Sequence, residues 1–181
     1  MNCPLCKNHT MQGINLEPDL LGQSCDACGG VWISRSNYES WRSKQPHTIT
    51  ENPAPVSIQV SDTHKAKICP ECRHLLLPYR VGHGLPFSID YCGACGGVWL
   101  DHNEWDAIKA KNLHGDMHDM VSENWQTAVR QVELQETIEQ TYKRQLGSTY
   151  EKAAEVRAWL QKQQQKSLLL AYLSGTTTNG K

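Results

Sequence analysis

The chain has 181 residues, a formal net charge of −1 and a mean hydropathy of −0.57. Phenylalanine occurs only once, so a single large hydrophobic core is not expected and several small domains are favoured. No apolar run approaches the roughly 20 residues that a membrane-spanning helix needs, and the near-neutral charge excludes a globally basic nucleic-acid-binding protein.

Eight cysteines fall into four Cys-x-x-Cys pairs, and the pairs form two matching sets. The sets are Cys3, Cys6, Cys25 and Cys28, and Cys69, Cys72, Cys92 and Cys95. Each set begins with Cys-Pro-x-Cys and ends with Cys-x-Ala-Cys-Gly-Gly-Val-Trp, and no cysteine is left over. Four thiolates satisfy the tetrahedral geometry of Zn²⁺, and the spacing of the pairs is that of zinc modules. We therefore predict two structural zinc ions, one in each set; iron is the other metal that four thiolates suit.

Three other uses of cysteine fit this pattern less well. Disulfide bonds would use the same residues, but the chain begins MNCPLC without a secretory signal, so we expect a reducing, cytoplasmic location. A thioredoxin-like Cys-x-x-Cys would lie near a βαβ pattern, and none is visible. A catalytic zinc keeps one coordination position open, whereas four cysteines close the shell.

Residues 1–45 are predicted to form a first zinc ribbon (ribbon 1) with a short helix. Two short apolar stretches flank a turn near Pro18, which predicts a hairpin. A weak capping signal at Ser34 begins the helix, and Pro46 ends it. Residues 46–66 hold three prolines among polar residues and predict an extended linker, so we expect the ribbons to move separately.

Residues 67–112 are predicted to form a second zinc ribbon (ribbon 2) of the same kind. Apolar residues alternate with others on both sides of a Gly/Pro cluster at residues 82–86, which is the pattern of a β-hairpin. The alternating residues are Leu75, Leu77, Tyr79, Val81, Phe87, Ile89 and Tyr91. Asp101-x-x-Glu104 is a capping box, in which the glutamate accepts a bond from the backbone N–H of the cap residue, and it predicts a short helix.

The two cysteine sets define an internal repeat of about 66 residues. The segments CDACGGVWISRSNYESW and CGACGGVWLDHNEWDAI align over their whole length. This motif resembles the TFIIB-type zinc ribbon, also called the transcription factor zinc-finger family, in which CxxCGGVWLD precedes a short helix. Ribbon 1 departs from it at Ile33-Ser34 and at Asn37, where the family has Leu-Asp and an acidic residue. The resemblance implies a small metal-stabilised α+β fold of two tandem rubredoxin-like zinc ribbons and a link to transcription.

Residues 113–173 are predicted to be helical, and residues 174–181 to be a disordered tail. Apolar residues recur at three- and four-residue steps on both sides of Gly147. A glycine at this point indicates a helix stop, and Ser148-x-x-Glu151 predicts a new helix start as a second capping box.

Charge is divided unevenly along the last half of the chain. Residues 101–140 carry three basic and nine acidic side chains, whereas residues 141–181 carry seven basic and two acidic ones. Two solvated helices would show this polarity, as would an α-hairpin folded at Gly147 or the same pairing between subunits. A basic surface for nucleic acid or an acidic protein is the third account, and the sequence leaves all three open.

No catalytic residue is predicted. His114 and His118 lie four positions apart, but no His-Glu-x-x-His pattern joins them, and we expect exposed histidines on a polar helix. Trp32 and Trp99 follow the Gly-Gly of each repeat, a fixed position that favours packing inside the ribbon over stacking with bases. Nucleophile elbows, phosphate loops and paired-carboxylate motifs are absent from the sequence.

The sequence therefore favours a zinc-binding, non-enzymatic interaction module that docks on a protein partner, with an association with transcription implied by the resemblance. The alternative is direct binding of nucleic acid by the basic helix from Lys143 to Lys166. The C-terminal helices are candidates for joining copies of the chain into a homo-oligomer.

Overall fold

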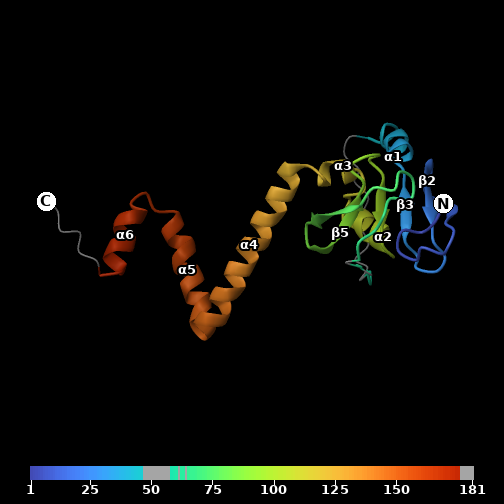
Figure 1. The fold of residues 1–181 in the computed structure, drawn as a ribbon. Helices are drawn as coiled ribbons and strands as arrows, with labels where there is room; N and C mark the ends of the chain where they lie inside the picture. Colours follow the sequence, from blue (N-terminus) through green and yellow to red (C-terminus); the bar gives the residue numbers. More distant parts are fainter. Residues whose placement is uncertain (47–57, 61, 64, 176–181) are drawn as a thin grey trace. The chain divides into compact units, whose positions relative to one another are not determined.

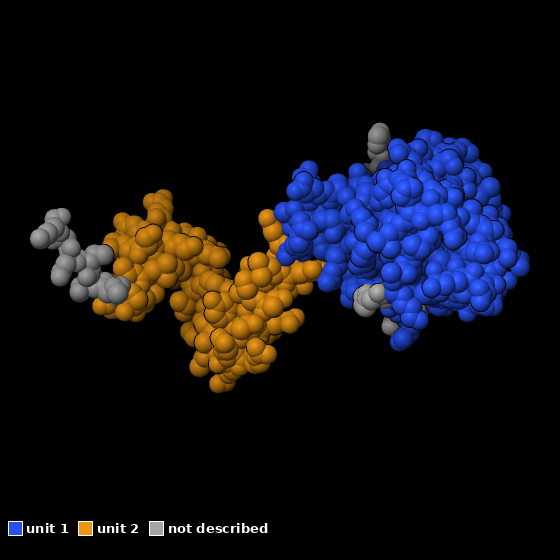
Figure 2. All heavy atoms as spheres, in the orientation of Figure 1, with its two compact units in different colours: residues 1–130 blue, residues 131–181 orange. Residues whose placement is uncertain are grey.

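The computed structural model describes residues 1–46, 58–60, 62–63 and 65–175. They form two compact units, Met1–Arg130 and Gln131–Lys181, which Figure 2 colours separately. Most of the predicted linker at residues 46–66 and of the predicted tail at residues 174–181 lies outside the described residues.

The first unit is built on one six-stranded antiparallel sheet, of which Figure 1 labels β2, β3 and β5. Its strands are β1 (Gln12–Glu17), β2 (Leu20–Ser24), β3 (Val31–Ile33), β4 (Leu77–Gly82), β5 (Leu85–Tyr91) and β6 (Val98–Leu100). Ribbon 1 supplies the first three strands and ribbon 2 the last three, in the spatial order β1-β2-β3-β6-β5-β4. The predicted α+β fold of two hairpin ribbons followed by helices is confirmed.

Turn chemistry explains the two hairpins. Pro18 and Asp19 connect β1 to β2, and Asp19 takes a left-handed φ of 68°, which an acidic side chain tolerates at this turn position. His83 and Gly84 connect β4 to β5 with φ values of 54° and 79°, so both central residues of this tight turn are left-handed. Such turns match the right-handed twist of the flanking strands.

The two ribbons are joined by the antiparallel pairing of β3 with β6. In this register Val31 lies opposite Leu100, Trp32 opposite Trp99, and Ile33 opposite Val98. Trp32 therefore faces its own counterpart in the repeat, and Val31 and Ile33 each face the counterpart of the other, which is the pattern of a self-complementary two-fold interface. The prediction that the ribbons move separately is wrong, because hydrogen bonds between β3 and β6 make them one sheet.

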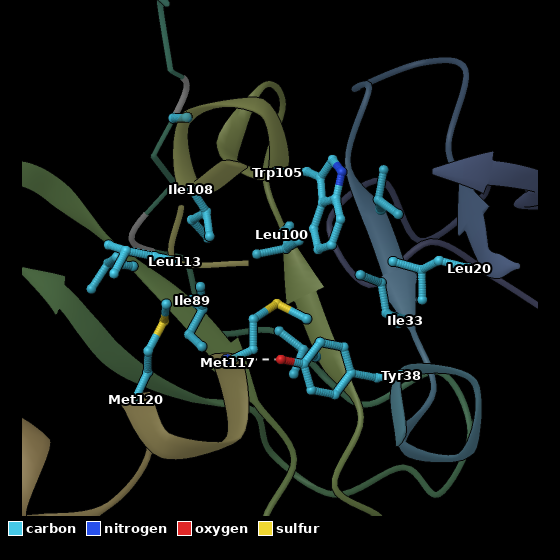
Figure 3. Packing of buried hydrophobic residues seen from close by; sticks show 14 of the residues in the cluster. Leu20, Ile33, Tyr38, Ile89, Leu100, Trp105, Ile108, Leu113, Met117 and Met120 are labelled. Atoms are coloured by element: carbon cyan, nitrogen blue, oxygen red, sulfur yellow. Dashed lines mark hydrogen bonds between the residues drawn. The ribbon is translucent and has the colours of Figure 1, made fainter. Parts of the chain in front are cut away.

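The central strands β3 and β6 are buried on both faces. Val31, Ile33 and their repeat counterparts face a core that the helices cover, whereas the two tryptophans face a second cluster that contains the buried cysteines. Both ribbons contribute to the first core, including Leu20 and Ile33 from ribbon 1 and Ile89 and Leu100 from ribbon 2 (Figure 3). The hydrophobic core is thus shared between the repeats.

Each ribbon is followed by the short helix that the sequence predicts. Helix α1 (Arg35–Arg42) is capped by Ser34, whose hydroxyl accepts a bond of 3.3 Å from the backbone N–H of Asn37. Helix α2 (Glu104–Ala110) begins after Asn103, and the Glu104 carboxylate accepts a bond of 2.8 Å from the backbone N–H of Asp101. The glutamate half of the predicted capping box is therefore present, although the Asp101 side chain bonds elsewhere.

The first unit extends beyond the predicted end of ribbon 2 at residue 112. The short helix α3 (Met117–Met120) buries both of its methionines in the shared core, and the Tyr38 hydroxyl accepts a bond of 3.1 Å from the backbone N–H of Met117 (Figure 3). Trp125, at the start of α4 (Glu123–Leu146), donates a bond of 3.0 Å to the carbonyl oxygen of Val81. Because of these contacts, the first unit extends to Arg130.

The second unit consists of the rest of α4 and three further elements: the 3₁₀ turn η1 (Gly147–Thr149), α5 (Tyr150–Gln161) and α6 (Lys166–Leu173). Glu139 bonds to Tyr150 and pairs with Arg157 at 2.7 Å, so the acidic and basic segments do meet beside the turn at Gly147. The predicted capping box at Ser148 is wrong, because that residue lies inside η1 and α5 starts without a side-chain cap. Of the helices that the structure describes, none has the length and apolar character needed to cross a membrane.

Candidate metal centres

The structure brings the eight cysteines together in the two sets that the sequence indicates. Within each set, the four Sγ atoms all lie within 4.8 Å of one another, and none of the eight cysteines is in a disulfide. The Sγ atoms of Cys3 and Cys28 are 3.7 Å apart, and those of Cys69 and Cys95 are 3.6 Å apart. A zinc–sulfur bond of about 2.3 Å implies sulfur–sulfur edges of about 3.8 Å in a tetrahedron, so the donor sets fit zinc.

Backbone N–H groups point at the sulfurs from tight turns. The N–H of Cys6 donates to the Sγ of Cys3 at 3.3 Å, and the N–H of Cys72 donates to the Sγ of Cys69 at 3.4 Å. Such donors stabilise thiolates, the form that binds metal. Burial acts to raise the pKa of the Cys92 thiol, but the backbone N–H of Cys95 and the neighbouring thiol of Cys72 outweigh it and lower the pKa to about 7.

Both sites are closed and partly covered. Two cysteines of each set are buried and two are half-buried. Four protein ligands complete a tetrahedral shell and leave no position for substrate or activated water, so the chemistry available to these centres is structural.

In each ribbon, the second glycine of the Gly-Gly pair leaves space for a tryptophan ring of the other ribbon. A Cβ atom on Gly97 would lie 2.1 Å from the Trp32 ring, and one on Gly30 would lie 2.2 Å from the Trp99 ring. Only glycine leaves room for these rings. Gly29 and Gly96, the first glycine of each pair, turn the backbone with left-handed φ values of 69° and 75°. The contact with the opposite tryptophan is an additional role that sequence reasoning missed.

Both tryptophans are closed off from any nucleic acid base. Trp32 is 1% exposed and donates a bond of 3.1 Å to the Glu71 carboxylate of the other ribbon. Trp99 is 0% exposed and donates a bond of 2.7 Å to Asp101. The prediction that these rings pack inside the ribbons is confirmed, although the ring contacts cross from one ribbon to the other.

A buried network of charged side chains lies beside Trp99. Lys67 is 1% exposed, and its ammonium group lies 2.6 Å from Asp90 and 3.3 Å from Asp101. Burial acts to lower the pKa of Lys67, but the two carboxylates outweigh it and raise the pKa, so the lysine stays charged. Sequence reasoning missed this lysine because nothing in its local context separates it from a surface residue.

Glu104 and Asp62 bring further carboxylates to the same place. Asp62, Asp101 and Glu104 converge within 4.8 Å, a grouping that metals sometimes use. The Asp101 oxygens, however, already accept bonds from Trp99, from Lys67 and from the backbone N–H of Thr63 at 2.8 Å. We therefore interpret the group as a hydrogen-bonded structural network.

Replacing Glu104 with glutamine is expected to stabilise the fold at neutral pH. Burial raises the pKa of Glu104 from 4.5 to about 9, and Asp101 and Asp62 add to the rise. Between pH 4.5 and about pH 9, folding therefore takes up a proton at Glu104. The free energy of unfolding is highest, as far as this group is concerned, below pH 4.5 and falls as the pH rises toward about 9. Glutamine needs no proton, and the variant should gain about 1–3 kcal/mol at pH 7.

Guanidinium denaturation of both proteins with saturating zinc, followed by tryptophan fluorescence across this pH window, measures the difference. The gain should shrink toward zero at acidic pH. A stability difference that does not change with pH would show that Glu104 folds in its ionised form.

None of the histidines that the structure describes takes part in the two centres. His74 contacts the carbonyl oxygen of Cys72 at 3.1 Å through Nδ1, and both it and His9 are exposed. The prediction of exposed histidines at positions 114 and 118 is wrong. His114 is buried between Trp41 and Trp105, and His118 packs edge-on against Tyr38, because α3 folds back onto the core of the ribbons.

The comparisons with known proteins agree with this geometry. The family model described as transcription factor zinc-finger matches residues 2–44 and, again, residues 68–111. Both ribbons belong to the transcription factor zinc-finger family. The two closed four-cysteine centres of this tandem zinc-finger protein hold two zinc ions. No curated protein and no solved structure gave a significant match to the chain.

Proposed function

We propose that this tandem zinc-finger protein is a non-enzymatic scaffold that docks on a protein partner through ribbon 2, in association with transcription. Zinc holds the ribbons in shape and takes no part in a reaction. The proposed location is the cytoplasm, where reducing conditions keep eight thiolates available for metal.

An apolar patch that only one of the two ribbons carries supports the proposal. Ile68, Leu75 and Leu77 are 42%, 51% and 46% exposed, and we call them the docking patch. Ile68 and Leu75 face each other in an isolated β-bridge, and Leu77 follows on the same side of the strand, two residues later. The patch is contiguous and lies directly beside Cys69, on backbone that the metal centre fixes.

Ribbon 1 has polar residues at the corresponding places. Asn2 and Thr10 form the matching β-bridge, and Gln12 begins β1 as Leu77 begins β4. The two ribbons share one fold, so the fold itself does not require apolar residues at these three positions. An exposed apolar patch on a rigid hairpin is the chemistry of a protein-binding surface.

The triple variant I68N/L75T/L77Q tests the proposal, because it gives ribbon 2 the residues that ribbon 1 already tolerates. We expect it to fold, to bind two zinc ions and to lose the partner. The measurement is affinity capture from an extract of the source cells with zinc-loaded bait, followed by quantitative mass spectrometry. The matched control is Leu21→Asn, which removes a leucine that is 54% exposed but lies outside the docking patch. Capture of the same proteins at equal levels by wild type and triple variant would refute the assignment of this patch.

Nucleic-acid binding by the basic C-terminal segment is the alternative function. Its basic side chains are partly engaged: Arg157 pairs with Glu139 at 2.7 Å, and Lys152 pairs with Glu155 at 2.7 Å. Phosphate contacts need free cationic groups, so these pairs favour the protein partner. Fluorescence anisotropy of the zinc-loaded protein with labelled DNA and RNA, over a salt series, separates the two functions. Micromolar binding with a steep salt dependence, weakened by charge reversal at Lys162, would favour nucleic acid instead.

A further inference from the structure

The second unit has almost no core of its own. Among its described hydrophobic residues, only Leu160 is buried. The large exposed ones are Val132, Leu134, Ile138, Tyr142, Leu146, Val156, Trp159, Leu168, Leu170, Tyr172 and Leu173. Short helices with so little packing are marginal in water, so these surfaces need a cover.

An apolar groove runs between α5 and α6. Its walls include Val156 and Leu160 from α5, and Leu170 and Leu173 from α6. Basic residues also line it, Lys152 and Arg157 on α5 and Lys166 on α6, and we call these three the basic rim. The groove therefore suits an apolar helix that carries negative charge.

The chain itself contains such a helix. Residues 131–142 of α4 carry Leu134, Ile138 and Tyr142 at four-residue steps, which places them on one face, and all three are exposed. The same segment holds three glutamates, at positions 133, 136 and 139, and no lysine or arginine. Within one copy Glu139 pairs with Arg157, so the negative charge that complements the groove is that of Glu133 and Glu136, and the positive charge is that of Lys152 and Lys166.

Within one copy this segment does not fill the groove. The residues that line the groove all come from position 148 onward, and Leu134 is 61% exposed. Glu139 contacts α5 beside the turn, where it bonds to Tyr150 and Arg157. The bidentate hydrogen bond between Arg157 and Glu139 nevertheless shows that a glutamate of α4 can pair with a cation of α5.

We propose that two copies of the chain form a dimer in which residues 131–142 of α4 from each copy lie in the α5–α6 groove of the other. The contact is reciprocal, so it closes with two-fold symmetry and leaves no open end for further addition. A second copy is the occupant that matches both features of the groove, its apolar walls and its basic rim. An anionic lipid surface would match the rim but would repel the acidic segment that lies beside it in the chain.

Charge reversal on each side of the contact gives a test that unfolding cannot imitate. The variant E133K/E136K makes the helix basic, and the variant K152E/K166E makes the rim acidic. Each variant alone places like charges together, so we expect the dissociation constant of each homodimer to rise about tenfold or more. An equimolar mixture restores both contacts, because each basic helix then meets an acidic rim and each acidic helix a basic one. The mixture should form a heterodimer with nearly wild-type affinity.

Sedimentation velocity of the full-length, zinc-loaded proteins from about 1 to 100 µM measures these constants. Far-UV circular dichroism checks that the helices are retained, and the docking-patch variant I68N/L75T/L77Q should dimerise like wild type, which keeps this test separate from the proposed docking function. Three outcomes overturn the proposal: a wild-type protein that stays monomeric over this range, a mixture that fails to recover the dimer, and flotation of wild type with anionic vesicles that the K152E/K166E variant loses.

Discussion

Replacing Cys92 with serine is expected to unfold both ribbons. A hydroxyl is a poor zinc ligand, so site 2 loses its metal, and the binding free energy of structural zinc is of the order of 10 kcal/mol. Ribbon 1 should follow because β3 pairs with β6, and because the Trp32 ring packs on Gly97 of ribbon 2. Zinc content by mass spectrometry and near-ultraviolet circular dichroism measure the two consequences together. We expect less than one zinc per chain and loss of the tryptophan signal.

His74→Ala is the matched control, since His74 lies two residues after Cys72 and is not a metal ligand. This variant should keep two zinc ions and a native spectrum. A Cys92→Ser protein that kept one full equivalent of zinc and half of the tryptophan signal would contradict the coupling. It would mean that zinc-loaded ribbon 1 keeps its fold without ribbon 2. Chelation of wild type should give the same unfolded first unit.

Replacing Gly97 with alanine is expected to separate the ribbons without touching a ligand. The new Cβ would lie 2.1 Å from Cζ2 of Trp32 and 2.5 Å from Cη2, far inside van der Waals contact. The ring is 1% exposed and has no room to move, so we expect a loss of about 3 kcal/mol or more. Thermal or guanidinium unfolding at saturating zinc measures the loss. Gly30→Ala should show a loss of similar size, since its Cβ would lie 2.2 Å from Cζ2 of Trp99.

Gly93→Ala provides the control in the turn between Cys92 and Cys95, because no atom lies within 4 Å of the added Cβ. The contrast between the two alanine variants isolates the cost of the clash from the general effect of glycine removal on the unfolded chain. Equal stabilities for Gly93→Ala and Gly97→Ala would sink the claim that the tryptophans hold the ribbons together.

The features that sequence predicted well are those fixed by local chemistry. The cysteine spacing indicated both metal centres, because ligand geometry is set within a few residues of each turn. Alternation around residues 82–86 located the second hairpin, and the glutamate of the capping box at Glu104 was correct. These signals depend on neighbours in the chain and need no knowledge of what packs against them.

The pairing of the ribbons was missed because its strands carry no periodic signal. β3 and β6 are Val-Trp-Ile and Val-Trp-Leu, three residues each, buried on both faces, so apolar and polar residues cannot alternate. The repeated Gly-Gly-Val-Trp was itself the available clue: identical apolar edges can pair with each other by two-fold symmetry. Lys67 was missed, and His114 and His118 were misplaced, for a related reason, since the burial of these residues depends on elements distant in sequence.

The joining of β3 to β6 also determines what the segment between the ribbons has to do. Because the interface lies between two halves of one chain, the connection acts as a covalent tether that makes the pairing of β3 with β6 intramolecular. Loop-closure entropy rises slowly with length, by about 0.6 kcal/mol for each doubling, so a longer tether would weaken the pairing only slightly. A cut in the tether would instead make assembly of the sheet a bimolecular reaction, and the fold of each zinc finger would then depend on protein concentration.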